Sequence, residues 1–305
     1  MNLESGQARD EFASLTERSA LVEEVRARID AGGPMTFRAF MEAALYHPRY
    51  GYYRTSEGVT GRGGDYVTSP EVHPVFGTLV AKQIIEFWEA MGRPAAFDVV
   101  EVGTGRGLLA RDILLRAGQD AGFAAAVRYR ICEPSELLRQ AQRRSLTEAG
   151  IDDHSVEWSD ALPDRVRGCI VTNELLDALP VHRVVRRGDE LLEVYVGHDG
   201  EGFHDVPAPL SDARLGAYFD ELGLLPGDGC YAEVNLDAVE WVRSAAGAVD
   251  AGYVLTFDYG YEGEELYAPW RRDGTLLCFY RQSASSDPYQ RIGRQDMTAS
   301  VDFTT

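Results

Sequence analysis

The segment from Val99 to Leu109 reads Val-Val-Glu-Val-Gly-Thr-Gly-Arg-Gly-Leu-Leu, so a short apolar run ends in an acid and then breaks into alternating glycines. Glycine lets a backbone turn sharply, and it lets a ligand approach more closely than a Cβ atom would allow. The helix expected from Leu108 onward would present free N–H groups in its first turn. The segment therefore predicts a site for a nucleotide-like ligand at a strand-to-helix turn.

The spacing of these glycines separates ligand classes. The dinucleotide fingerprint needs glycine or alanine where Leu108 stands, and a P-loop needs a Lys-Ser/Thr pair that does not follow here. The pattern E-x-G-x-G-x-G is typical of S-adenosylmethionine sites, because this cofactor has no phosphate and its amino group favours a nearby carboxylate. The alternative is a glycine-rich turn without a ligand in an unrelated α/β protein. The predicted cofactor-binding residues of this turn are Glu101, Gly103, Thr104, Gly105 and Gly107.

Two further acids follow the next predicted strands. Glu133 stands where a ribose-binding carboxylate belongs, although it lies 32 positions after Glu101, where about 20 is usual. Asp160 is placed to accept a hydrogen bond from an adenine amino group. The competing interpretations are that Glu133 caps the helix beginning at Pro134-Ser135, and that Asp160 is an exposed loop residue.

The segment Thr172-Asn173-Glu174-Leu175-Leu176-Asp177 follows the fourth predicted strand. In an open parallel sheet, ligands meet catalytic groups at the carboxyl ends of the strands. A guanidinium has a pKa above ~12, so a carboxylate is needed to orient it and to accept its proton during methyl transfer. Glu174 and Asp177 are the predicted catalytic residues, with Glu233 as a second member and Asn173 beside the cofactor. Alternatively, Asn173 and Asp177 cap a short helix and Glu174 is solvated.

The elements that must hold these residues alternate between strand and helix, which predicts an α/β fold with a parallel sheet. A hairpin around Gly188-Asp189 is expected in an insertion over about 183–232, which should cap the substrate side. A helical pattern that includes Leu15 and Leu21 ends at Gly32-Gly33-Pro34. The predicted strands are 97–102, 127–132, 156–158, 169–172, 253–258 and 274–280, and the predicted helices include 35–45, 76–91 and 108–115.

Composition narrows the function classes. A formal charge of -19 argues against a nucleic-acid partner, because binding a polyanion depends on Lys and Arg, whereas a basic protein segment would be attracted. No apolar run approaches ~18 residues and the first residues do not resemble a signal peptide, so we expect no membrane partner and a cytoplasmic location. The cysteines are far apart in apolar runs, which predicts buried thiols and no metal site. They are Cys132, Cys169, Cys230 and Cys278.

Several blocks of the sequence, in order, resemble the MidA-type methyltransferases. They cover about residues 35 to 305, and this ordered set is far more specific than a single glycine motif. The blocks are Phe40–Pro48 with Gly51-Tyr52-Tyr53, Gly64–Val72 with Phe76-Gly77, Glu101–Gly107, Asn173–Pro180, Asp258-Tyr259-Gly260 and Asp296–Phe303.

The resemblance implies a class I methyltransferase fold: a Rossmann-like doubly wound sheet with an N-terminal helical cap and a β-hairpin insertion. It implies S-adenosyl-L-methionine as cofactor, with the Gly64–Gly77 block, including Thr68 and Pro70, closing over it. The expected domains are an extension over 1–95 that covers the cofactor and a methyltransferase domain over 96–305.

The family includes a mitochondrial assembly factor that methylates an arginine of a respiratory complex I subunit. By analogy, the leading prediction is arginine N-methylation of a partner protein. Methylation of a small molecule in a biosynthetic pathway, and a non-catalytic assembly factor that keeps the cofactor fold, are the alternatives.

Overall fold

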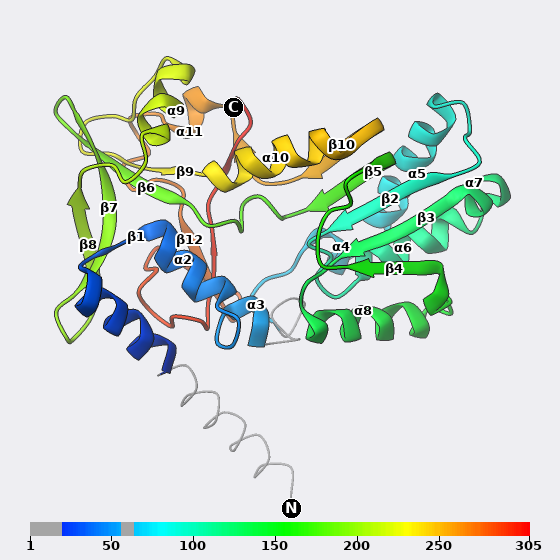
Figure 1. Cartoon of the computed structure of the whole chain (residues 1–305), viewed down its shortest axis with the longest axis horizontal. Coiled ribbons are helices and arrows are strands. Elements are labelled where there is room, and N and C mark those ends of the chain that lie inside the picture. The colour runs from blue at the N-terminus through cyan, green and yellow to red at the C-terminus, as the bar shows by residue number, and fades with distance from the viewer. Residues whose placement is uncertain (1–19, 56–63) are drawn as a thin grey trace, which may run out of the picture. The chain divides into compact units, whose positions relative to one another are not determined.

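The computed structural model describes residues 20–55 and 64–305, and these form two compact units (Figure 1). One unit, here called the antiparallel unit, combines 20–55, 177–237 and 259–305; the other, the parallel-sheet unit, combines 64–176 and 238–258. The division differs from the predicted boundary after residue 95. The segment 64–95 belongs with the parallel sheet, and the predicted insertion belongs with the chain's N- and C-terminal parts.

The parallel-sheet unit contains a sheet of five parallel strands in the order β10-β5-β2-β3-β4. The predicted parallel α/β fold is therefore confirmed. Two strands have the predicted bounds, whereas β5 and β10 begin earlier than their apolar runs suggest. The strands are β2 (Phe97–Val102), β3 (Val127–Cys132), β4 (Val156–Ser159), β5 (Val166–Asn173) and β10 (Val249–Phe257).

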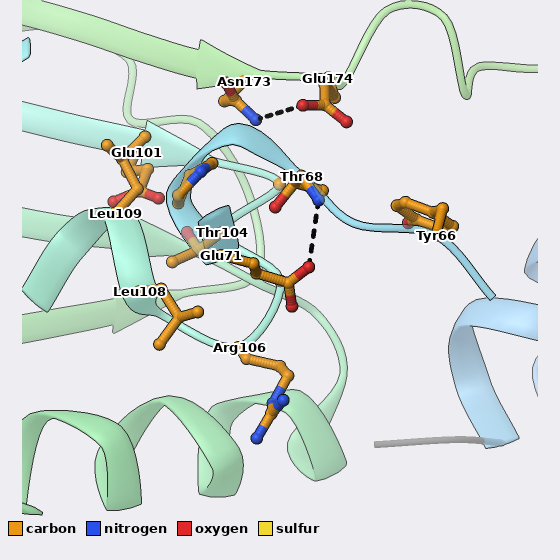
Figure 2. A pocket seen from close by; sticks show the side chains of 13 residues that line it. Tyr66, Thr68, Glu71, Glu101, Thr104, Arg106, Leu108, Leu109, Asn173 and Glu174 are labelled. Carbon is orange, nitrogen blue, oxygen red and sulfur yellow. Dashed lines mark hydrogen bonds between the residues drawn. The ribbon is translucent and has the colours of Figure 1, made fainter. Parts of the chain in front are cut away.

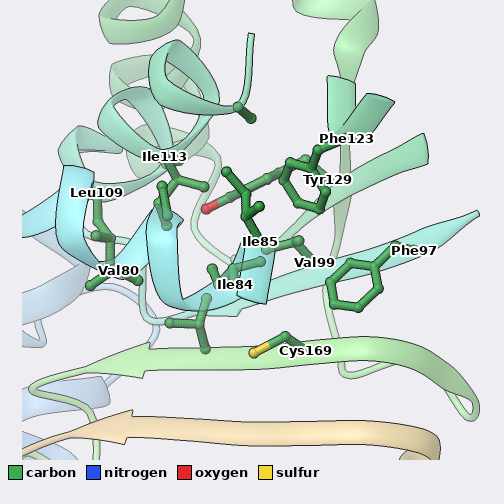
Figure 3. Packing of buried hydrophobic residues seen from close by; sticks show 14 of the residues in the cluster. Val80, Ile84, Ile85, Phe97, Val99, Leu109, Ile113, Phe123, Tyr129 and Cys169 are labelled. Atoms are coloured by element: carbon green, nitrogen blue, oxygen red, sulfur yellow. The ribbon is translucent and has the colours of Figure 1, made fainter. Parts of the chain in front are cut away.

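Helices cover both faces of this sheet. Because side chains alternate along a strand, Phe97 and Val99 of β2 pack among residues of one helix layer, while Val100 packs with Ala245 and Ala248 of α10 on the other face. Figure 3 shows the first cluster. The helices in the first layer are α5 (Val75–Ala90), α6 (Leu108–Ala117), α7 (Ala121–Ala126) and α8 (Glu136–Glu148), and α10 spans Leu236–Ala248.

The packing of helix α5 explains why residues 64–95 belong to the parallel-sheet unit. Its buried residues Val80, Ile84 and Trp88 are part of the same hydrophobic cluster as β2, and they have no more than 5% of their surface exposed. Removing that much apolar surface from water stabilises the unit by several kcal/mol at ~25 cal/mol per Å². The helix is therefore an integral layer of the parallel-sheet unit.

The antiparallel unit is built around the predicted hairpin. Strands β6 (His182–Arg187) and β7 (Glu190–His198) pair on either side of Gly188-Asp189, which confirms the hairpin. Their sheet has the order β1-β7-β6-β9, and β8 pairs with β7. The remaining strands of this sheet are β1 (Met35–Thr36), β8 (Phe203–Ala208) and β9 (Tyr231–Val234).

Two smaller sheets complete the antiparallel unit. The predicted strand 274–280 is shorter, because β12 (Leu277–Tyr280) begins only after the turn at Gly274-Thr275. It pairs with β13 (Ser283–Ser285) and β14 (Asp296–Thr298), and β11 (Gly260–Tyr261) pairs with β15 (Val301–Asp302).

The helices of this unit lie mostly in its N-terminal part. Residues 20–32 are helical, whereas Leu15 of the predicted pattern lies outside the described residues. Arg38 of α2 donates to both oxygens of Asp237, at 3.0 and 2.7 Å, which ties two distant parts of the chain together. The helices are α2 (Phe37–Tyr46), α3 (Tyr52–Thr55), α9 (Arg214–Leu222) and α11 (Gly263–Leu266). Across 20–55 and 64–305, every helix is too short or too polar to traverse a bilayer.

Helix α6 offers a matched test of the core. Ile113 is fully buried and Leu115, on the same helix, is 46% exposed. We expect Ile113→Ala to lower the free energy of unfolding by about 2–5 kcal/mol, because it leaves a cavity, and Leu115→Ala to change it by less than about 1 kcal/mol. Urea unfolding followed by circular dichroism measures both. Equal losses in the two variants would contradict the described packing.

Candidate functional site

A pocket lies within the parallel-sheet unit where β2 and β5 end (Figure 2). Three segments supply its walls: the glycine turn after β2, the end of β5, and the segment Tyr66–Glu71, here called the strap. The pocket is lined by Tyr66, Thr68, Pro70, Glu71, Glu101, Gly103, Thr104, Gly105, Arg106, Leu108, Leu109, Asn173 and Glu174.

The three glycines of the turn are each required for a different reason. All have positive φ, at +72° for Gly103, +53° for Gly105 and +82° for Gly107. A Cβ on Gly103 would lie 2.9 Å from Leu175 Cδ1, so the turn packs directly on the Asn173–Asp177 segment. A Cβ on Gly105 would meet nothing within 4 Å, and Gly105 lines the pocket, so the space beside it is open.

Gln142 of α8 is hydrogen-bonded to the glycine turn. Its Nε2 donates to the Gly105 carbonyl at 2.9 Å, and its Oε1 accepts from Trp158 Nε1 at 3.0 Å. The backbone of Gln142 is also why Gly107 has no side chain, because a Cβ there would lie 3.1 Å from Gln142 Cα. Gln142 is fully buried and was not predicted, since one glutamine in a polar helix gives no signal in the sequence.

Glu101 ends β2 as a buried carboxylate with 2% exposure. The Tyr129 hydroxyl on the neighbouring strand donates to Glu101 Oε2. Burial raises the pKa of Glu101 to about 7, although the hydrogen bonds from Tyr129 and Thr104 act in the opposite direction. A carboxylate this poorly solvated attracts a cationic group in the pocket strongly.

The strap closes one side of the pocket. Thr68 N donates to Glu71 Oε2 at 3.1 Å, which stabilises the first turn of the short helix α4 (Ser69–Val72). Ser69 N donates to Glu174 Oε1 at 3.4 Å, so the strap and the end of β5 are hydrogen-bonded to each other. The predicted residues Thr68 and Pro70 both line the pocket.

Glu174 has a strained backbone. Its φ is +52°, in the left-handed region that a residue with a side chain rarely adopts, and its N–H donates to the Phe257 carbonyl at 2.8 Å. Asp258 Oδ2 accepts from Leu176 N at 2.8 Å and fixes the turn that follows. Strain of this kind persists where the surroundings over-determine it, and such positions cluster at functional sites.

The two oxygens of Glu174 are differently engaged. Oε1 accepts from Ser69 N and from Asn173 Nδ2 at 3.3 Å, whereas Oε2 accepts no hydrogen bond from the residues that the structure describes. Burial raises the pKa of Glu174, and the negative charges of Asp258 and Glu71 act in the same direction. The carboxylate is therefore held by one oxygen and presents the other as an acceptor.

Glu133 and Asp160 do not line this pocket. Glu133 is buried and accepts from Ser135 N at 2.8 Å and from Gln142 Nε2 at 3.5 Å. The helix α8 is capped by Ser135 itself. Glu133 follows Glu101 at an unusually long distance in the sequence because an extra helix, α7, lies between β2 and β3. Asp160 is exposed and paired with Arg139.

Asp177 and Glu233 belong to the antiparallel unit. Glu233 is buried, and its carboxylate accepts from Thr275 N at 2.6 Å, Thr275 Oγ1 at 3.2 Å and Arg183 Nε at 3.3 Å. These bonds hold the turn before β12. Asp177 is also buried, and its carbonyl accepts from Ala299 N at 2.9 Å.

The pocket contains residues that the sequence analysis did not single out for the cofactor. Tyr66 and Glu71 lie in the Gly64–Gly77 block, which the family resemblance places over the cofactor, so the resemblance could have identified them. Arg106, Leu108 and Leu109 follow directly from the position of the turn.

The pocket fits S-adenosylmethionine in its chemistry. The carboxylates of Glu71, Glu101 and Glu174 line the pocket, and their charge suits the sulfonium and ammonium groups of this cofactor. The space beside Gly105 is open. Among its lining residues the only basic side chain is that of Arg106, which in Figure 2 points away from the carboxylates toward α8. This charge distribution disfavours a phosphate-bearing ligand.

Comparisons with known proteins agree with this chemistry. Residues 79–305 match the family described as "Putative S-adenosyl-L-methionine-dependent methyltransferase". The chain belongs to this family. It is an S-adenosylmethionine-dependent methyltransferase of the MidA type.

Two solved structures resemble the whole described fold. A COG1565 superfamily member from Burkholderia thailandensis bound to S-adenosyl-homocysteine is 33% identical with a TM-score of 0.88, covering 95% of this chain and 75% of that one. A native structure of a COG1565 superfamily protein from the same organism is 32% identical with a TM-score of 0.85, and the match covers 95% of this chain and 74% of that one.

Curated relatives are protein arginine methyltransferases of mitochondria. The homolog of NDUFAF7 from Drosophila melanogaster is 32% identical, covering 93% of this chain and 68% of its own length. NDUFAF7 from Danio rerio is 28% identical, and the match covers 96% of this chain and 72% of that protein's length. The expected cytoplasmic location is contradicted by these relatives, because they are mitochondrial proteins.

Glu101 makes the stability of the ligand-free protein depend on pH. Its pKa is raised in the folded state, so the folded protein binds a proton that the unfolded chain has released, and stability falls as pH rises from about 4.5 toward 7. Glu101→Gln, which mimics the protonated group, should reduce this fall by up to about 3 kcal/mol. Urea unfolding at pH 5 and pH 8 measures it. An identical pH dependence in both proteins would show that Glu101 is not buried as described.

Proposed function

We propose that this chain transfers a methyl group from S-adenosylmethionine to a guanidino nitrogen of an arginine in a partner protein. The observation that carries the proposal is Glu174, a carboxylate on a strained backbone with one oxygen anchored and the other available at the pocket. The names of the curated relatives support arginine as the acceptor. The strongly acidic composition is compatible with a basic target.

The cofactor would be held mainly by the turn and the strap. Glu101 would attract the ammonium group through its buried charge, and the backbone at Gly103, Thr104 and Gly105 would approach the ligand closely. Thr68, Pro70 and Asn173 line the same pocket. Glu133, Gly107 and Asp160 stay predicted binding residues, and Gln142 hydrogen-bonds both to Glu133 and to the Gly105 carbonyl of the turn.

The cofactor supplies a methyl group on a positively charged sulfur. Glu174 would hold the guanidinium plane with charge-assisted hydrogen bonds, so that a nitrogen lone pair faces the methyl carbon. The N–C bond forms as the S–C bond breaks, and the proton lost from the nitrogen passes to the Glu174 carboxylate. Its raised pKa makes this carboxylate a better proton acceptor than a solvated glutamate.

Asp177 and Glu233 stay predicted partners of Glu174 in catalysis. The hydrogen bonds of Glu233 to Thr275 and Arg183 favour a structural role for this residue.

The open side of Gly105 gives the first test. Gly105→Val should abolish S-adenosylmethionine binding measured by calorimetry, because the branched side chain fills ligand space. Gly150→Val is the matched control, since Gly150 also has positive φ, at +75°, and open space around its Cβ position, but lies at the end of α8. The control should lose stability and still bind the cofactor. Unchanged affinity of Gly105→Val would remove this turn from the site.

The acceptor is tested with labelled cofactor. We expect the enzyme to transfer methyl label to proteins of a lysate, and hydrolysis followed by mass spectrometry to find it on arginine. Glu174→Gln should bind the cofactor normally and slow transfer by about 100-fold or more. Glu157→Gln, an exposed control on β4, should behave as wild type. Label only on metabolites would favour the small-molecule alternative, and no transfer would favour an assembly factor. A fully active Glu174→Gln enzyme would refute the mechanism.

A further inference from the structure

The antiparallel unit contains a second cavity of about 680 Å³, separate from the pocket of the parallel-sheet unit. Its size is in the range of ligand-binding cavities. Its walls combine tyrosine rings with carboxylates, and all of them come from the antiparallel unit. The tyrosines are Tyr231, Tyr261 and Tyr289, and the carboxylates are Asp205, Asp273 and Asp287.

Two of the three tyrosine rings of this cavity pack against guanidinium groups of the chain. The guanidinium carbon of Arg271 lies 4.0 Å from the centre of the Tyr261 ring, and that of Arg183 lies 5.0 Å from the centre of the Tyr231 ring. A planar, weakly hydrated guanidinium stacks on an aromatic face more favourably than an ammonium does. The walls are therefore compatible with a further guanidinium ligand.

The charge of the cavity also favours a cation. Arg183 is paired with Glu233 at 3.3 Å and with Asp205 at 3.6 Å, so its charge is offset within the wall. Arg271 is paired with Glu265 at 3.7 Å. Asp273 and Asp287 have no ionic partner among the described residues, so the cavity keeps an excess of negative charge.

The rim of the cavity is partly apolar. Leu277 lines it and is 42% exposed. Trp270 is not a lining residue, but it precedes the lining residue Arg271 in the chain and is 74% exposed. Exposed tryptophan is enriched among the residues that dominate binding energy at protein interfaces. These side chains suit a peptide better than an isolated small cation, because a peptide brings apolar groups beside its charge.

We propose that this cavity binds an arginine-containing segment of the protein substrate, with Asp273 and Asp287 as the carboxylates that select the guanidinium. The inference rests on the proposed arginine methyltransferase function, for which it names a second recognition site apart from the cofactor pocket. The cavity prefers arginine over lysine because its tyrosine faces match a planar cation, and it rejects citrulline, which has the same shape without the charge.

The test is calorimetry with a blocked peptide, Gly-Gly-Arg-Gly-Arg-Gly-Gly, and its lysine and citrulline analogues. The full chain should bind the arginine peptide at least about tenfold more tightly than the citrulline peptide, with lysine between them. D273N/D287N should lose about tenfold in affinity for the arginine peptide. Asparagine at position 287 keeps the side-chain oxygen that accepts from Tyr289 N at 2.9 Å. It loses only the oxygen that accepts from the exposed Gln290 Nε2 at 2.7 Å.

The matched control is D189N/E190Q, which removes two charges at the exposed β6–β7 turn of the same unit. It should bind the peptide as the wild type does. Urea unfolding followed by circular dichroism should match the wild type for all variants, which reports that the antiparallel unit is folded. Tyr261→Leu should reduce the preference for arginine over lysine, whereas Tyr261→Phe should keep it, because only the ring is needed.

Three results would overturn the proposal: no binding by the wild type at millimolar peptide, equal affinity for arginine and citrulline peptides, or wild-type affinity in D273N/D287N. The proposed function is judged separately by methylarginine formed in protein. Methylarginine together with any of the three results refutes the cavity and leaves the function standing. Arginine-selective binding that depends on Asp273 and Asp287, without methylarginine from any source, supports the cavity and refutes the function.

Discussion

The left-handed turn after β2 is the constraint on which the cofactor site depends. All three glycines have positive φ, and Leu175 and Gln142 occupy the volume that a side chain on Gly103 or Gly107 would take. The turn therefore links three parts of the parallel-sheet unit. Packing against Leu175 couples it to the segment that follows β5, and the hydrogen bond from Gln142 to the Gly105 carbonyl couples it to α8. A change in either contact would move the backbone that lines the pocket.

Three carboxylates line this pocket, and each lies in a different environment because each comes from a different segment of the chain. Glu101 is buried beneath the turn and carries the larger shift in pKa, to about 7, whereas Glu174 sits at the edge with one anchored oxygen. A cationic ligand in this pocket would favour the ionised form of both groups. Cofactor binding and the charge state of the site would therefore be linked. Without a ligand, the buried charge of Glu101 lowers the free energy of unfolding at neutral pH.

Much of the parallel sheet could be predicted, because buried parallel strands are continuous apolar runs with turn residues at their ends. The strand before Gly103 and the strand 127–132 were predicted with their observed bounds. Gly103 and Gly105 of the turn, Thr68, Pro70 and Glu174 line the pocket, and their roles stay predictions. What the sequence could not show was pairing between distant segments. Gln142 and Tyr129 act through such contacts, and no local pattern marks them.

The division into units was missed for the same reason. The antiparallel unit is assembled from three separate stretches of chain, joined by pairings such as Arg38 with Asp237 and β1 with β7. A linear boundary after residue 95 cannot describe it. The sequence likewise placed Glu233 near catalysis, whereas the structure shows its carboxylate bound to Thr275 and Arg183.

A crystal structure of this chain with S-adenosyl-homocysteine tests the central claim most directly. The account predicts density for the ligand along the backbone from Gly103 to Gly105, beneath the strap and beside Glu101 and Glu174. A ligand bound elsewhere, or an empty turn in crystals that bind NAD or ATP at the same place, would contradict it.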